Sequence, residues 1–103
     1  MVKPTKSWTL AAALVIGATF AGGPARAEMA SGAVLANTCF SCHGTDGKSV
    51  GAMPTIAGKT AGFIAEKLKA FKSGQLEATV MNRIAKGFSD AEIEALAKFF
   101  SGM

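Results

Sequence analysis

Two cysteines and the chain's only histidine lie within five residues, Cys39-Phe40-Ser41-Cys42-His43. On a helical turn, residues three positions apart share one side, so the Cys39 and Cys42 thiols can reach the edge of one flat molecule. The His43 imidazole follows directly and can bind a metal ion at the centre of that molecule. Cys-x-x-Cys-His is the attachment signature of c-type haem, in which each thiol forms a thioether with a vinyl group. The motif predicts one covalent haem c with His43 as an axial iron ligand.

Three other chemistries use the same residue types. A disulfide between Cys39 and Cys42 would leave the adjacent His43 unexplained. A thioredoxin-like redox pair usually accompanies a βαβ pattern, and the sequence shows no convincing strand alternation. A structural zinc site takes four ligands, whereas the chain offers two cysteines and one histidine. Haem attachment is the interpretation that uses all three side chains.

A second strong axial ligand from a side chain has to be a methionine, because His43 is the sole histidine. Met29 and Met103 lie close to the ends of the expected mature segment. Met53 follows His43 closely and would need a tight fold-over to reach the opposite face of the iron. Met81 comes much later, so the chain has room to pass around the ring edge. Spacing favours Met81 over Met53 and leaves open that Met81 is an ordinary core methionine.

The first 27 residues have the layout of a secretory signal peptide. Lys3 and Lys6 precede an uncharged, mostly apolar run over 8–22, and Ala25-Arg26-Ala27 gives the small-x-small pattern of a cleavage site. A membrane anchor fits less well, because a bilayer span needs about 20 apolar residues. We therefore expect a signal peptide over 1–27, cleavage after Ala27, a periplasmic location and no membrane span in the mature chain.

The expected mature segment, 28–103, is one small domain with almost balanced charge. Three of the 11 basic residues and none of the seven acidic ones lie before the cut. The remaining balance gives no concentrated basic surface, which excludes nucleic-acid binding as the expected function. A domain of this size has a marginal core and usually needs a staple. Two cysteines cannot make a disulfide scaffold, so the haem ring is the expected filler.

The local patterns predict an all-α segment with three to four helices. Ser89 and Glu92 form a capping box before a helix that runs to about Phe100. The apolar stripe of that helix recurs at helical spacing and consists of Ile93, Leu96, Ala97 and Phe100. A middle helix is expected over 60–72, ended by Gly74. Its buried face would hold Ile64, Leu68 and Phe71, and its wet face Glu66, Lys67, Lys69 and Lys72.

Two further helices are expected with less periodic support. The first covers about 29–41, with Val34, Leu35 and Thr38 available for packing, and a short one covers about 79–86. The stretch 44–58 contains four glycines and a proline, which favours an irregular backbone. A loop of that length inside a small domain is uncommon unless it wraps something.

The segment 28–103 resembles class I cytochromes c over its whole length. The matching stretches lie at 39–44, 49–51, 54–57, 71–74 and 79–88. Within that class the sequence is most similar to the cytochrome subunits of flavocytochrome c sulfide dehydrogenases, and more loosely to the cytochrome c4 and c553 groups. The resemblance implies a class I cytochrome c fold around one covalent haem. It also implies Met81 as the distal iron ligand and a Pro54 carbonyl that accepts the imidazole proton of His43.

Two axial ligands would leave the iron no open site, so it would carry electrons rather than catalyse a reaction. The resemblance implies a subunit that accepts electrons from a separate flavoprotein, which oxidises sulfide. A freestanding carrier that shuttles electrons between other redox proteins is the alternative, and a haem sensor or peroxidase would require an open iron. The basic residues that could frame an exposed haem edge, or be ordinary solvated charges, are Lys48, Lys59, Arg83 and Lys86.

Overall fold

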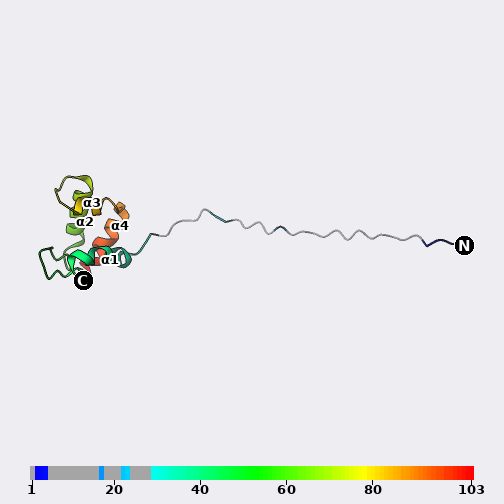
Figure 1. Ribbon diagram of the computed structural model, residues 1–103, viewed down its shortest axis with the longest axis horizontal. Helices are drawn as coiled ribbons and strands as arrows, with labels where there is room; N and C mark the ends of the chain where they lie inside the picture. The colour runs from blue at the N-terminus through cyan, green and yellow to red at the C-terminus, as the bar shows by residue number, and fades with distance from the viewer. Residues whose placement is uncertain (1, 5–16, 18–21, 24–28) are drawn as a thin grey trace.

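The computed structural model describes residues 2–4, 17, 22–23 and 29–103. The expected cleavage site and most of the expected signal peptide, 1–27, lie outside the described residues. The described part contains four α-helices, a single 3-10 turn and no strand (Figure 1). In this described part no helix is long and apolar enough to cross a membrane. The all-α prediction is confirmed.

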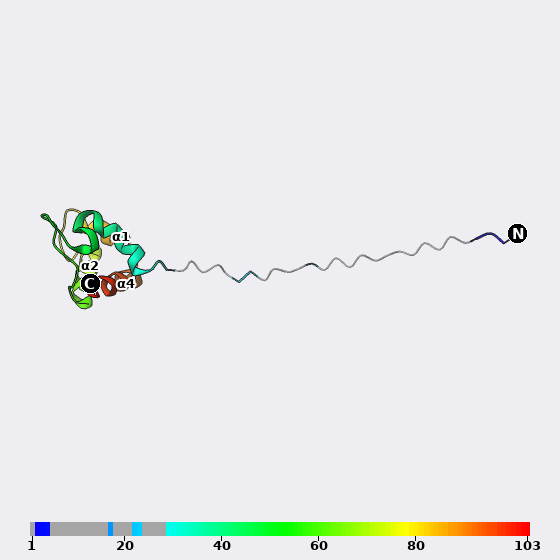
Figure 2. The ribbon, with the colours of Figure 1, turned by 90° about the horizontal axis from the view of Figure 1, so that it is seen from below.

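The helices follow in the order α1 (Gly32–His43), η1 (Thr45–Gly47), α2 (Ala61–Ser73), α3 (Met81–Ala85) and α4 (Asp90–Ser101). Helix α4 packs against both α1 and α2, and α3 packs against α2 (Figures 1 and 2). The interior side chains are few, and the largest fully buried ones are Phe100, Ile93 and Leu96, all from α4. They join Ala36 of α1 and Ile64 of α2 in one cluster. The predicted apolar stripe of α4 is confirmed.

Side-chain caps fix where the helices begin. The Ser31 hydroxyl accepts a hydrogen bond from the backbone N–H of Val34, and the Thr60 hydroxyl accepts one from that of Phe63. At α4 the capping box is complete: Glu92 N–H donates to Ser89 Oγ at 3.1 Å, and Ser89 N–H donates to Glu92 Oε2 at 2.8 Å. Each cap satisfies a backbone donor that the first turn cannot pair. The caps place the starts of α2 and α4 within a residue of the prediction.

Helices α1 and α4 cross at close range because α1 begins with a glycine. A Cβ at Gly32 would collide with the carbonyl oxygen of Ala95. Ala36, one turn later on the same side, is fully buried. This close face turns Val34 outward, where it is 60% exposed. Of the three residues expected to be available for packing, Leu35 packs against the core, whereas Val34 does not, since small residues of α1 face α4.

The loop after α1 is tied to the C-terminal part of α4. Gly47 has φ 75°, and a Cβ there would lie 2.8 Å from a ring carbon of Phe100. The Gly47 carbonyl accepts hydrogen bonds from the N–H groups of Ile56 and Ala57, and the N–H of Gly58 donates to the Phe100 carbonyl. These contacts hold the glycine-rich segment against the helical body and close one side of a cavity.

Candidate functional site

An apolar cavity of about 750 Å³ opens between the end of α1, the loop before α2, the inner face of α2 and the start of α3. Its size falls within the range of about 300–1,000 Å³ usual for small-molecule and cofactor sites. The side chains of α4 that reach it are Leu96 and Phe100. The four helices thus surround a space that the chain's own side chains do not fill.

Both cysteines border this cavity, as the i, i+3 spacing predicts. They are free thiols, Cys39 half-buried and Cys42 exposed, and are not bonded to each other. Burial raises the pKa of the Cys39 thiol, against a smaller lowering by the hydrogen bond with the Thr38 hydroxyl. Hydroxyls of Thr38 and Ser41 lie 3.9 Å from the sulfurs of Cys39 and Cys42. Two thiols at one edge of the cavity can hold a flat ligand at two points.

His43 ends α1 and is buried, with 8% of its surface exposed. Its Nδ1 lies 2.7 Å from the carbonyl oxygen of Pro54. A carbonyl can only accept a hydrogen bond, so Nδ1 carries the proton and donates. A tautomer with its proton on Nδ1 has the lone pair of Nε2 available for a metal ion. A bond of this kind fixes the tautomer and the orientation of a ligating imidazole.

Two of the methionines border the cavity, Met53 and Met81. Met81 is the first residue of α3 and is partly buried, whereas Met53 lies in the loop and is 50% exposed. Met29 and Met103 are absent from the lining. Both methionines that the sequence left in competition are therefore within the site.

Most of the remaining lining is hydrocarbon. Ile64, Leu68 and Phe71 were expected on the buried face of α2, and all three border the cavity. Phe63 and Val80 were not singled out from the sequence, yet both border it and are about half exposed. Apolar side chains that face a hollow and remain uncovered fit a large apolar ring, because burial of their surface would be favourable.

Among the described residues that line the cavity, the basic side chains are Lys59 and Lys67. Lys59 is one of the four basic residues expected near a haem edge, and the other three do not border the cavity. Lys67 was expected on the wet face of α2. It is exposed, but it also borders the cavity, because it lies one turn after Phe63.

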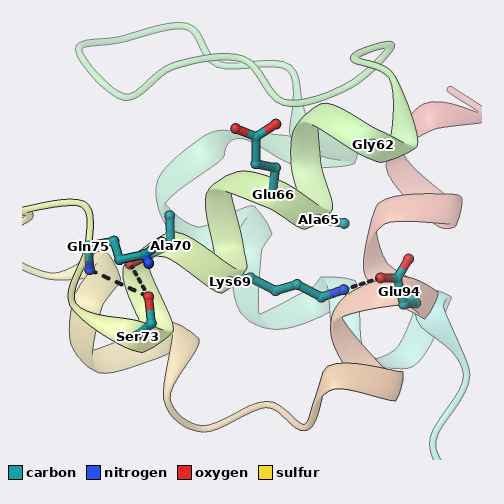
Figure 3. Close-up of a pocket in the computed structure, with 8 residues that line it drawn as sticks. All are labelled: Gly62, Ala65, Glu66, Lys69, Ala70, Ser73, Gln75 and Glu94. Carbon is teal, nitrogen blue, oxygen red and sulfur yellow. Dashed lines mark hydrogen bonds and ion pairs between the residues drawn. The ribbon is translucent and has the colours of Figure 1, made fainter.

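A second hollow of about 660 Å³ lies on the other side of α2 (Figure 3). Lys69 reaches from α2 toward Glu94 of α4 and forms an ion pair with it, while Glu66 points away from this pair. The hydrogen bond to Glu94 raises the pKa of Lys69. The described lining of this hollow contains no cysteine, histidine or methionine, and its Lys69–Glu94 pair joins α2 to α4.

Comparison with known proteins gives one family over almost all of the described helical part. A family model described as "Cytochrome c" matches residues 29–103. The chain is 42% identical over 72 residues to the cytochrome subunit of sulfide dehydrogenase from Chlorobaculum tepidum, covering 70% of this chain and 66% of the relative. It is 34% identical over 89 residues to cytochrome c-553 of Nitratidesulfovibrio vulgaris, covering 82% and 87%.

A solved structure shares the same arrangement of helices. The cytochrome c4 of Acidithiobacillus ferrooxidans superposes with a TM-score of 0.61 at 37% sequence identity, covering 63% of this chain and 38% of that one. A further relative, cytochrome c-552 of Acidithiobacillus ferridurans, is 37% identical over 65 residues, which cover 28% of its length. The chain thus matches about a third of these two longer proteins and just under two thirds of the sulfide dehydrogenase subunit.

Proposed function

The chain belongs to the cytochrome c family and is an electron-transfer protein with covalently bound haem c, and on that premise we propose that it is the cytochrome subunit of a sulfide dehydrogenase. In this role it accepts electrons from a flavoprotein subunit. The single observation that carries the electron-transfer role is that Cys39, Cys42, His43 and Met81 all border one apolar cavity. The sulfide link is supported by the 42% identity to the Chlorobaculum tepidum subunit.

We assign the four site residues as follows. Cys39 and Cys42 would form the two thioethers, and His43, through Nε2, and Met81 would be the two iron ligands from the chain. Met53 directly precedes Pro54, whose carbonyl oxygen accepts the hydrogen bond from Nδ1 of His43. Met53 therefore shares the histidine side of the cavity, and this placement supports Met81 as the opposite ligand.

These residues favour electron transfer over catalysis. When bound, the haem supplies a one-electron couple. With His43 and Met81 as its two ligands from the chain, the iron would have no position left for a substrate. The methionine sulfur raises the reduction potential, and the apolar walls keep water away from the ring. A flavin can store two electrons and release them singly, which suits a one-electron acceptor.

A freestanding carrier is the second candidate function, and the lengths of two relatives favour it. The match covers 87% of the Nitratidesulfovibrio vulgaris cytochrome c-553 and 94% of the cytochrome c-554(548) from Halomonas halodenitrificans. A chain of this kind would exchange electrons with several redox proteins instead of binding one flavoprotein permanently.

We further propose that residues 1–27 direct export and are removed after Ala27, which places the mature protein in the periplasm. The charge and hydropathy layout of that segment supports this proposal. N-terminal sequencing of the exported protein tests it: Glu28 as the first residue is expected, and a retained leader would contradict it.

The proposed complex is tested by affinity capture of the tagged, haem-loaded chain from periplasm of its own host. The expected result is a co-eluting protein with bound flavin, and reduction of the haem when sulfide is added to the captured complex. The chain alone should not be reduced by sulfide at that rate. A monodisperse monomer without a flavin-containing partner would contradict the subunit role and favour the freestanding carrier.

A further inference from the structure

We propose that Lys67, together with Lys59, binds the propionate carboxylates of the haem and fixes the ring edge opposite the two thioethers. The proposal rests on the haem site described above and adds residues that hold the second edge of the ring. Cys39 and Cys42 hold the ring through its vinyl groups, which lie on two adjacent pyrroles. The two propionates lie on the other two pyrroles and need partners of their own.

The charge of the cavity lining carries the proposal. Lys59 and Lys67 are the only lysines of the described lining, and that lining contains no aspartate or glutamate. A carboxylate brought from water to the mouth of an apolar cavity loses hydration and is stable there only with a paired cation or hydrogen-bond donors. Two ammonium groups among hydrocarbon side chains provide that pairing for two carboxylates.

Neither lysine has another ionic partner among the described residues. The ion pairs of α2 use Lys69 with Glu94 and Lys72 with Asp90, and both lie on the side that faces α4. Lys67 and Lys59 therefore differ from the other lysines near α2 in what they face. Their ammonium groups remain available for an anion that the chain itself does not supply.

A cation–π contact places the Lys67 ammonium at the cavity mouth. Its Nζ lies 5.6 Å from the centroid of the Phe63 ring, and Phe63 borders the same cavity one turn earlier on α2. Such a contact restricts the conformations of the long lysine side chain, and it leaves the ammonium group without an anionic partner. Lys59 lies immediately before Thr60, the N-cap of α2, and Lys67 is the middle residue of that helix. Both lysines border the same cavity.

The test uses haem-loaded protein and two readouts that do not depend on turnover. Resonance Raman propionate bending bands report hydrogen bonding to the propionates, and an electrode titration gives the reduction potential. Lys67→Met should shift the propionate bands and lower the potential, because a nearby positive charge stabilises the reduced site. The double variant Lys59→Met/Lys67→Met should enlarge both shifts. Lys67→Arg keeps the positive charge, so it should keep the potential of the wild type. Lys98→Met, on the exposed side of α4, is the matched control and should change neither.

Three outcomes separate the possible roles. Unchanged bands and potential in the double variant, at full haem content, would overturn the proposal. Slower reduction by a redox partner with an unchanged spectrum would also overturn it and assign the lysines to partner docking. Absence of haem from the wild-type chain would instead contradict the proposed function, so the two failures are distinguishable by haem content alone.

Discussion

One hydrogen bond sets the chemistry of the site at the scale of single residues. The Pro54 carbonyl, 2.7 Å from Nδ1 of His43, decides which imidazole nitrogen carries the proton. Because that nitrogen is used, the other one is left as a metal ligand. Proline suits this position because its fixed φ limits the ways in which the loop can turn its carbonyl away.

The axial role of Met81 is testable by Met81→Ala. Removal of the thioether should open one iron position, change the absorption spectrum, permit tight binding of carbon monoxide to the ferrous protein and lower the reduction potential. The reason is that a methionine sulfur stabilises the reduced iron and blocks its face. The absorption spectrum with and without carbon monoxide and an electrode titration measure these effects.

Met53→Ala is the matched control for that experiment, since Met53 also borders the cavity. The absorption spectrum and reduction potential of this variant should stay close to those of the wild type. If Met53→Ala alters both and Met81→Ala alters neither, the ligand is Met53 and our assignment is wrong.

The sequence predicted part of this site and had no signal for the rest. Cys39, Cys42 and His43 follow from the motif alone, because its spacing is tied to one chemistry. The contact of Pro54 with His43 was expected only through the family resemblance. Lys67 was placed on the wet face of α2, since helical periodicity separates polar from apolar residues but does not detect a hollow that a ligand fills.

At the scale of elements, capped ends make the helices begin where they do. Ser89→Ala removes the acceptor for Glu92 N–H at the start of α4. We expect a loss of about 1 kcal/mol in the free energy of unfolding, because one backbone donor is left to water. Urea unfolding of the haem-loaded protein measures it.

Ser73→Ala is the control for the Ser89 variant, since Ser73 is exposed at the end of α2 and caps no helix start. Its effect should remain within about 0.5 kcal/mol. Equal losses in the two variants would show that the capping box contributes nothing specific to α4.

The crossing of α1 and α4 is tested by a pair of glycine replacements. Gly32→Ala should destabilise the haem-loaded protein by about 1–3 kcal/mol, because its Cβ meets the Ala95 carbonyl and the helices must move apart. Gly62→Ala, in α2 with open space around its Cβ, should instead stabilise by up to about 1 kcal/mol. Denaturant midpoints compare the two, and a neutral or stabilising Gly32→Ala would contradict the close crossing.

Local signals account for which elements the sequence could predict. Helix α4 carries both a capping box and a strong apolar stripe, so its start and its buried face were predicted correctly. The buried face of α1 was predicted only in part: Leu35 packs against the core as expected, but Val34 does not. That face depends on how closely α4 approaches Gly32 and Ala36. That approach depends on how α1 and α4 pack in the folded protein, so the sequence pattern of α1 alone does not predict it.

At the scale of the whole molecule, the interior is too small to account for the fold by itself. Among the residues that the structure describes, the largest fully buried side chains are three, all from α4. Beside them lies a cavity of about 750 Å³ with apolar walls. A domain of this size rarely gains more than about 3–5 kcal/mol from its own core. We therefore expect the haem to supply further contacts that hold α1, α2 and α3 around it.

The far-ultraviolet circular dichroism spectrum of the Cys39→Ala/Cys42→Ala chain tests this claim most directly. Both the variant and the wild type are produced in a host able to attach haem, and intact mass confirms that the variant carries none. We expect the variant to lose most of the helical signal of the wild type and to show no cooperative unfolding transition. A haem-free variant with the full helical signal and a sharp unfolding transition would contradict it.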